Sequence, residues 1–344
     1  MRDADEPSVE SVSRHVFAFG APTDAIYGHM VLRTDGTIMG YRHANESSWR
    51  LSKSGELEFL SEAGYRTSRL EARSASAWVG KAEDSRFPVM LVSVLHHDAT
   101  GSLPSIVVNS IPKAGTYFLE AALTRSGFPS SGLQLGGRRS VDDYRGLSLS
   151  EMHRTPERHR LAFPVELAPC ITPGCTTPAH VECLETVARM REYGLHVVHL
   201  KRDLRDVVIS LYRFKLDRVA PTDELDQAWR SLDEPTRLCA FLFHYARSDL
   251  AHICDMAKLI ATEPALAYED LMAARISGSM ASVFEAICPG LSTRLAVELS
   301  NVRDKPTSTL LSSHSNWRLR WTDQVQKIFV ALGLDEANKL LGYA

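Results

Sequence analysis

Short hydrophobic runs separated by turn signals dominate the first part of the chain. Met30–Arg33 and Leu57–Leu60 are two such runs, and Asp35-Gly36 and Ser54-Gly55 are turn dipeptides near them. Runs of this length, bounded by glycine-containing turns and without a helical period, are typical of strands. The pattern therefore predicts a β-rich region over residues 14–98.

From about residue 103 the spacing of the hydrophobic positions changes. Ser105–Asn109 and His196–Leu200 are compact apolar runs, as expected of strands buried inside a parallel sheet. Segments with helical spacing cover residues 116–123, 181–194 and 204–214. Strands that alternate with helices predict an α/β fold, in which helices flank a central parallel sheet.

These two patterns divide the 344 residues into three parts. The start is acidic and has no apolar run behind it, so we expect residues 1–13 to be disordered. A small β-rich accessory domain is expected over residues 14–98 and one α/β domain over residues 103–344. Domains commonly have about 150 residues, so the length of the chain agrees with two folded domains.

Composition and charge exclude several classes of function. The chain is 44% hydrophobic and 24% charged, and its net charge of −3 provides no overall field that would attract nucleic acid. The longest apolar run, Val89–Leu95, is too short for a membrane span, which takes about 20 residues. Without a visible signal peptide, we expect a cytoplasmic protein whose six cysteines are reduced.

The loop after the 105–109 run has the composition of an anion site. It reads Ser110-Ile111-Pro112-Lys113-Ala114-Gly115-Thr116 and joins a strand end to a helix start. The first N–H groups of a helix are unpaired and its dipole favours negative charge, so Lys113, Gly115 and Thr116 would complete a phosphate cradle. Because Lys113 precedes the glycine, the loop differs from the Walker form of ATP- and GTP-binding proteins. A plain strand–helix joint with a solvated lysine is the alternative.

A second basic segment follows the 196–200 run and also passes from a strand end into a helix. Arg202 lies at the end of the strand, and Ser210 lies two turns into the helix. A guanidinium offers a planar fork to a phosphate, and a serine hydroxyl adds a donor. Asp203 and Asp206 are placed to cap the helix and hold arginines. The alternative is a charged helix start with internal salt bridges, which would contain the same residues.

Together the two segments resemble the donor site of the sulfotransferases that use 3′-phosphoadenosine 5′-phosphosulfate (PAPS). The 5′-phosphosulfate loop of that family reads Pro-Lys-x-Gly-Thr, which Pro112 to Thr116 match. Its 3′-phosphate segment reads Arg-Asp/Asn-x-x-Asp-Val-x-x-Ser, which Arg202 to Ser210 match. The resemblance implies a P-loop-like phosphosulfate-binding loop and PAPS as the donor. We call Pro112 to Thr116 the first corner and Arg202 to Ser210 the second corner.

Further residues extend the resemblance over about 103–344. Tyr268, in a Tyr-Glu-Asp-Leu segment, matches the family's adenine-contacting tyrosine, and Trp317-Arg318 matches its closing tryptophan segment. Tyr117 replaces a usual Thr or Ser, and Phe118 stands where many members carry an adenine-stacking tryptophan. The resemblance therefore adds these five residues to the donor-binding set.

The same resemblance implies a histidine general base on a strand end between the two corners. His180 lies 22 residues before Arg202 (202 − 180 = 22), and the predicted helix 181–194 follows it. We therefore take His180 as the candidate base. The competing histidines lie in a polar segment or inside a strand, where packing is the expected role: His153, His159, His196 and His199.

The mechanism implied by the resemblance is in-line transfer of a sulfuryl group to an acceptor hydroxyl. His180 would accept the hydroxyl proton, because imidazole titrates near neutral pH. Lys113 would stabilise the leaving phosphate oxygen, while Arg202 and Ser210 would hold the 3′-phosphate. Ser210 would also restrain Lys113 until substrate arrives. Basic groups and a helix N-terminus do the neutralising, so no metal is expected.

One segment departs from the family pattern. Members often carry Arg-Lys-Gly on the 3′-phosphate shortly before the closing tryptophan, and Leu310-Leu311-Ser312 stand at that spacing here. Lys305, His314 and Arg318 are the nearby basic residues that could replace this contact. The sequence therefore does not identify which residues, besides those of the second corner, would bind the 3′-phosphate.

Two other functions remain compatible with the residues. One is a nucleotide- or carbohydrate-binding module with a decayed transfer site, and the other is a small-molecule kinase, which would need magnesium and a Walker lysine. Trp49 and Trp78 in the β-rich region could face a sugar, although sheet core is the commoner role. The sequence leaves open the oligomeric state and the identity of the hydroxylated acceptor, which we expect to contact loops 128–178 and 213–235.

Overall fold

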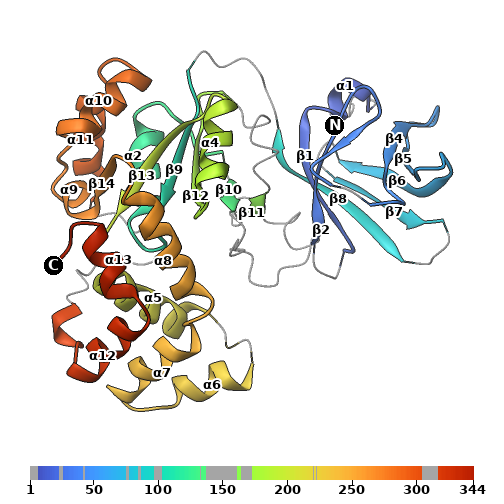
Figure 1. Ribbon diagram of the computed structural model, residues 1–344. Coiled ribbons are helices and arrows are strands. Elements are labelled where there is room, and N and C mark those ends of the chain that lie inside the picture. Colours follow the sequence, from blue (N-terminus) through green and yellow to red (C-terminus); the bar gives the residue numbers. More distant parts are fainter. Residues whose placement is uncertain are drawn as a thin grey trace. The chain divides into compact units, whose positions relative to one another are not determined.

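The computed structural model describes most of the chain, in two compact units (Figure 1). Of the described residues, the first unit contains those up to 96 together with 131, 133–135, 161–163 and 173, and the second contains Leu103–Ser130, Gly136 and those from Gly174 to Ala344. The described residues are 7–22, 26–41, 43–74, 77–83, 87–96, 103–131, 133–136, 161–163, 173–219, 221, 223–303 and 317–344.

The first unit is an antiparallel sheet whose two edges meet. Its eight strands follow the order β3-β2-β1-β8-β7-β6-β5-β4. Thr37 and Ser48 form a bridge beside the edge strands β3 and β4, and the Trp49 N–H donates to the Gly36 carbonyl at 2.9 Å. Closure of this kind covers the open hydrogen-bonding edges of a sheet. The strands are β1 His15–Gly20, β2 Ile26–Leu32, β3 Ile38–Met39, β4 Ser48–Leu51, β5 Leu57–Leu60, β6 Arg66–Ser74, β7 Ala77–Ala82 and β8 Pro88–His96.

Alternate residues along these strands point into one hydrophobic core, as the two-residue period of a strand requires. Phe17 and Phe19 of β1 pack there. Trp49 and Trp78 belong to the same core and are 3% and 2% exposed. The predicted β-rich region is therefore confirmed, and both tryptophans pack in the core and do not face a sugar.

A short helix, α1 (Val9–Val12), precedes the first strand. The Ser11 N–H donates to Ser8 Oγ at 3.1 Å, and the Ser8 N–H donates to Ser11 Oγ at 2.9 Å. This reciprocal cap satisfies two otherwise unpaired donors, and Val12 packs into the core. The expected disorder is therefore wrong for residues 9–12, while residues 1–6 lie outside the described part of the chain.

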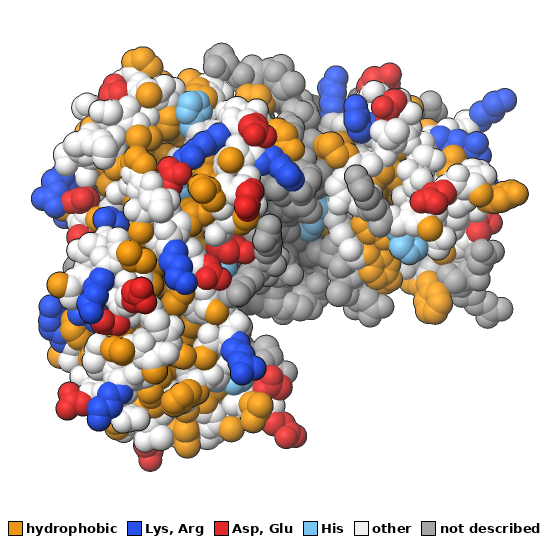
Figure 2. All heavy atoms as spheres, in the orientation of Figure 1, with side chains coloured by type: hydrophobic (Ala, Val, Ile, Leu, Met, Phe, Trp, Pro, Cys, Tyr) orange, Lys and Arg blue, Asp and Glu red, His pale blue; other side chains and the backbone are white. Residues whose placement is uncertain are grey.

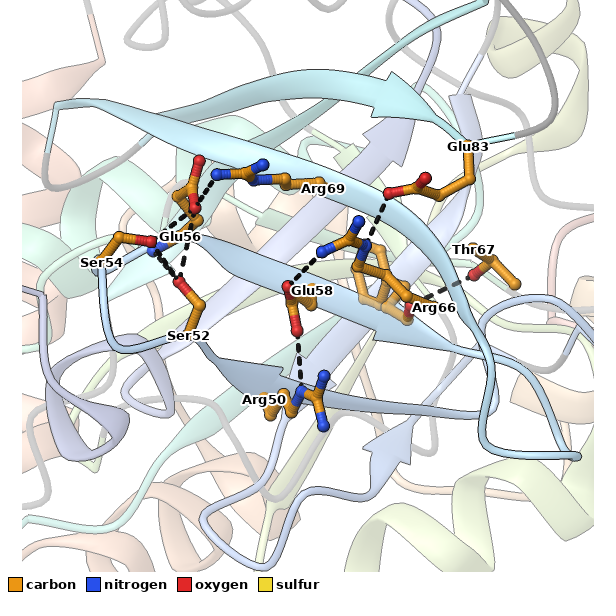
Figure 3. A network of polar contacts seen from close by, with 10 residues as sticks. Arg50, Ser52, Ser54, Glu56, Glu58, Arg66, Thr67, Arg69 and Glu83 are labelled. Carbon is orange, nitrogen blue, oxygen red and sulfur yellow. Dashed lines mark hydrogen bonds and ion pairs between the residues drawn. The ribbon is translucent and has the colours of Figure 1, made fainter.

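Ion pairs link the strands β4, β5 and β6 (Figure 3). Glu58, which is 5% exposed, accepts from Arg50 Nε at 2.7 Å and from Arg66 Nη1 at 2.9 Å. Arg66 also donates to Glu83 at 2.6 Å. Burial alone would raise the pKa of Glu58, but the hydrogen bonds from the two arginines hold it below its usual value. The network therefore keeps a buried carboxylate charged.

A parallel sheet forms the centre of the second unit. β9 (Ile106–Ser110) lies between β12 (Thr176–His180) and β13 (His196–Lys201), and β14 (Ala265–Ala267) follows β13. Helices pack on these strands, with α2 on β9 and β12, and α4 and α8 on β13. The predicted α/β fold, with a parallel sheet and flanking helices, is confirmed at this level. A further parallel pair is formed by β10 (Leu133–Gly136) and β11 (Leu161–Phe163).

The three helices predicted over residues 116–123, 181–194 and 204–214 are present in the second unit, with small shifts at their ends. The helix predicted over residues 181–194 begins later, at Leu184, and its N-cap residue, Cys183, has an extended backbone conformation. The helices are α2 Thr116–Arg125, α4 Leu184–Glu192, α5 Leu204–Arg218, α6 Glu224–Arg230, α7 Thr236–His244, α8 Asp249–Ile260, α9 Tyr268–Met272, α10 Gly278–Ile287, α11 Leu291–Val302, η3 Trp317–Leu319, α12 Asp323–Ala331 and α13 Leu334–Leu340.

The connections of the sheet diverge between β9 and β13. The chain leaves β9 through α2 and returns on one side of it at β12, whereas it leaves β13 through α5 and returns on the other side at β14. In open α/β sheets, ligands bind outside the carboxyl ends of two neighbouring strands whose connections diverge in this way. The first and second corners are the loops that follow these two strands.

Candidate functional site

Three neighbouring strands bring the predicted functional residues to one edge of the sheet. In the parallel register Ala179 lies opposite Asn109, and Leu200 lies opposite Ser110. The carboxyl ends of β12, β9 and β13 are therefore level. His180 ends β12, and the two corners follow the other two strands.

The first corner has the backbone of a close-approach loop. Lys113 and Gly115 have φ angles of 70° and 98°, in the left-handed region. A Cβ on Gly115 would lie 3.0 Å from Cδ2 of Tyr268, so a side chain at this position would push against the tyrosine ring. Thr116 begins α2, and its hydroxyl is hydrogen-bonded to the Ser110 hydroxyl. The loop therefore presents backbone and a helix start to the sheet edge, as an anion cradle requires.

Arg202 brings the two corners into direct contact. Its Nη1 donates to the Lys113 carbonyl at 2.9 Å, and its guanidinium carbon lies 3.9 Å from the centroid of the Tyr268 ring. The residue is 6% exposed. Lys113, Gly115, Arg202 and Tyr268 thus form one cluster, although they come from three separate segments of the sequence.

Lys113 extends toward the second corner. Its Nζ lies 4.0 Å from the centroid of the Phe214 ring, a cation–π distance. Ser210 is four residues before Phe214, so both residues share one face of α5. Phe214 was not predicted from the sequence, although its position one turn after the predicted serine is a signal that could have identified it. Restraint of Lys113 by Ser210 stays a prediction.

His180 is oriented by the backbone of β9. Its Nδ1 lies 2.6 Å from the Ser110 carbonyl, which can only accept, so Nδ1 carries the proton and the basic lone pair is on Nε2. The next residue is fixed as well, since the Val181 N–H donates to Asn109 Oδ1 at 2.8 Å and Asn109 Nδ2 donates to the Val181 carbonyl at 3.0 Å. This tautomer is the one that a general base acting through Nε2 needs.

The second corner is capped as the sequence predicts. Asp203 Oδ1 accepts from the Arg205 N–H at 3.0 Å, and its carboxylate also pairs with the Arg205 guanidinium at 2.6 Å. Asp206 accepts from the Trp317 N–H at 3.2 Å, and burial raises the pKa of Asp206. The Trp317 ring lies 4.2 Å from Arg205 and 4.7 Å from Arg318. Trp317 and Arg318 therefore lie beside the second corner.

Other predicted residues are placed less favourably for their expected roles. Phe118 is only 7% exposed and is one of the buried residues of α2. His196 is exposed at the start of β13, so the expected packing role is wrong for it. His199 is buried, and burial lowers its pKa to about 4, as suits a neutral core residue. The segment that replaces Arg-Lys-Gly, with Lys305 and His314, lies outside the described residues, as do His153 and His159.

The remaining predicted residues at the first corner are partly or fully buried. Pro112 and Tyr117 are partly exposed, and Ala114 is fully buried, with its N–H donating to the Ile111 carbonyl at 3.0 Å. On the face drawn in Figure 2, Lys and Arg side chains lie interspersed with Asp and Glu. The cluster around Arg202 is therefore a local feature of one sheet edge.

Neither a metal-binding cluster nor a membrane-spanning helix occurs in the part of the chain that the structure describes. Within it, His, Cys, Asp and Glu side chains form no group of three or more that could hold a metal ion. No described helix combines the length and the apolar character that a membrane crossing requires.

Among solved structures, 11 chains are similar to this one, including a protease inhibitor and a sulfotransferase. No protein family and no curated protein matches the sequence. A psychrophilic marine protease MP inhibitor covers 25% of this chain and 99% of its own, at 18% identity and a TM-score of 0.22. Mouse sulfotransferase SULT7A1 complexed with PAP covers 70% of this chain and 89% of its own, at 16% identity and a TM-score of 0.38. Both TM-scores are low, so the fold and the site rest on the chain's own strand order and contacts.

Proposed function

We propose that the chain is a sulfotransferase that moves a sulfuryl group from PAPS to an acceptor hydroxyl. The observation that carries the proposal is the contact between the two corners, in which Arg202 Nη1 lies 2.9 Å from the Lys113 carbonyl. PAPS carries anionic groups on both the 5′ and the 3′ side of one adenosine. Two adjoining basic corners follow neighbouring strands whose connections diverge, and they fit a donor with two anionic groups better than a single phosphate.

The residues present fit the donor in several respects. The cradle at Gly115 leaves room for backbone N–H groups to meet the 5′ group, and Lys113 adds a positive charge beside it. Arg202 and Ser210 would hold the 3′-phosphate. Tyr268, whose ring already stacks on a guanidinium, would contact the adenine. Tyr117, Phe118, Trp317 and Arg318 complete the proposed donor-binding set, with Phe118 acting from a buried position.

The proposed step conserves atoms and electrons. The acceptor oxygen bonds to sulfur while the bond from sulfur to the bridging phosphate oxygen breaks, and that oxygen keeps the electron pair. His180 takes the acceptor's proton on Nε2, since its Nδ1–H is held by the Ser110 carbonyl. Lys113 stabilises the negative charge that develops on the leaving oxygen. The products are a sulfate ester and 3′-phosphoadenosine 5′-phosphate (PAP).

The experiment that tests this function is a transfer assay with sulfur-labelled PAPS. The purified chain is incubated with phenols, sugars, lipids and natural-product scaffolds, and labelled esters are separated from the donor. Transfer to at least one acceptor, without added metal, is the expected result. PAP binding without any transfer would favour the decayed binding module, and magnesium-dependent transfer from ATP would favour the kinase.

A further inference from the structure

Residues 338–343 contact both sides of the proposed donor site, and we call them the C-terminal segment. Asn338 lies on α13 and is 2% exposed. Its Oδ1 accepts from the Leu204 N–H at 2.7 Å, and its Nδ2 donates to Asp203 Oδ1 at 3.2 Å. One amide side chain therefore satisfies both the capping carboxylate and the first N–H of α5.

The same segment contacts the neighbours of Arg202 and Tyr268. Lys201 Nζ donates to the Leu341 carbonyl at 2.8 Å, immediately before Arg202 in the chain. The Tyr343 hydroxyl donates to Glu269 Oε2 at 2.7 Å, immediately after Tyr268. Burial is the main cause that raises the pKa of Tyr343, so the hydroxyl keeps its proton for this bond.

These contacts surround Arg202 and Tyr268 without touching the atoms that would meet a nucleotide. Lys201 and Asp203 are the two chain neighbours of Arg202, and the C-terminal segment contacts both of them. The guanidinium stacks on Tyr268, whose next residue is also contacted. A shift of either backbone would misalign the stack, because charge-assisted contacts depend on the direction of the fork.

We propose that Asn338 is a positioning residue for the donor site, supported by Leu341 and Tyr343, and that it sets donor affinity through the backbone on both sides of Arg202. The inference rests on the proposed function. It assigns the site a determinant that lies 135 residues away from Asp203 in the sequence. His180 receives none of these contacts, so the effect should fall on donor binding and spare the transfer step.

The test measures PAP affinity by calorimetry, together with the donor KM, kcat and thermal midpoint. Asn338→Ala leaves the Leu204 N–H without its partner and removes one of the hydrogen bonds to Asp203, so we expect PAP affinity to fall about tenfold. The donor KM should rise in parallel, while kcat at saturating donor stays within about twofold. Asn301→Ala is the matched control, since Asn301 is exposed on α11 of the same unit and its side chain donates to Glu298 on the same helix.

A reciprocal exchange separates positioning from simple destabilisation. Asn338→Asp alone places two carboxylates together and should weaken PAP binding. Adding Asp203→Asn restores a donor opposite an acceptor and keeps an accepted N-cap residue, so affinity should return to within about threefold of the wild type. If Asn338→Ala does not fold, Tyr343→Phe removes only one hydroxyl and should weaken PAP binding in the same direction.

The outcomes distinguish the two proposals. Wild-type affinity in Asn338→Ala, or weak binding that the exchange does not restore, would overturn the positioning role while leaving the sulfotransferase proposal intact. Absence of PAP binding by the wild-type chain would instead overturn the proposed function itself.

Discussion

Arg66 of the first unit and Arg202 of the second are both held by more than one contact, but the contacts differ in kind. Arg66 donates to the carboxylates of Glu58 and Glu83 (Figure 3). Arg202 donates to a backbone carbonyl and stacks on an aromatic ring. Carboxylates pair with the charge of a guanidinium, whereas a carbonyl and a ring fix the direction in which it points.

The two units use their charged side chains in different ways. On the closed sheet of the first unit, arginines keep a buried glutamate ionised and link neighbouring strands, which serves stability. At the sheet edge of the second unit, Arg202 contacts the Lys113 carbonyl beside the start of α2, an arrangement that suits the donor binding we propose. Matched variants in the two units test this difference.

The largest effect is expected for the candidate base. His180→Ala should lower the rate of sulfuryl transfer about a thousandfold, the middle range for loss of a general base, while PAP binding stays near that of the wild type. His43→Ala, at an exposed histidine of the first unit that pairs with Glu46, is the control and should leave the rate unchanged. Unchanged transfer in His180→Ala would remove the base assignment.

A smaller but still large effect is expected for the stacked arginine. Arg202→Ala should weaken PAP binding about a hundredfold, because it removes a charge-assisted contact to the 3′-phosphate. Arg66→Ala should leave PAP affinity unchanged and lower the stability of the first unit by about 1 kcal/mol. Calorimetry and denaturant unfolding measure the two effects, and equal loss of affinity in both variants would contradict the division of roles.

Buried histidines predict an acid sensitivity in both units. Burial lowers the pKa of His29 and of His199 to about 4, so each is neutral in the folded state, whereas the unfolded chain protonates below about 6.5. Stability is therefore lost as the pH falls from about 6.5 to about 4, by up to about 2 kcal/mol per histidine at pH 5.

Amide-exchange protection in each unit, compared at pH 7 and pH 5, measures this loss. His29→Gln should remove it from the first unit alone and His199→Gln from the second alone. His196→Gln, at the exposed start of β13, is the control and should change nothing. A loss that persists in both Gln variants would contradict the assignment to these two histidines.

The smallest effect is expected on the rim of the ion-pair network. The Arg50 side chain is 61% exposed, and Glu58 keeps its contact with Arg66 when Arg50 is removed. Arg50→Ala should therefore cost about 0.5 kcal/mol of first-unit stability, as exposed pairs usually do. A loss as large as that of Arg66→Ala would show that Glu58 depends on both arginines equally.

Local patterns in the sequence predicted the elements that carry the site. The strands before the two corners and the helices after them are short, periodic and bounded by clear start signals, so their positions were close to those observed. The cap at Asp203 follows from local chemistry as well. His180 was expected at a strand end because of the resemblance to the sulfotransferase pattern, and β12 ends at His180.

Other features depend on contacts between distant residues and have no local pattern. Thr37 and Ser48 close the first sheet through one bridge between its edges. Asn338 meets Asp203 across 135 residues. Phe118, expected to stack on the adenine, is only 7% exposed. Tertiary packing decided these features, and periodicity alone cannot reveal them.

The most direct measurement of the central claim is a calorimetric titration of the full chain with PAP, adenosine 5′-phosphate and ATP, with and without EDTA. If the loops after β9 and β13 hold the two sides of one nucleotide, PAP binds at one site per chain and at least about tenfold more tightly than adenosine 5′-phosphate, which lacks the group assigned to Arg202. EDTA leaves this affinity unchanged. Equal affinity for the two nucleotides, or binding of ATP that requires magnesium, would contradict it.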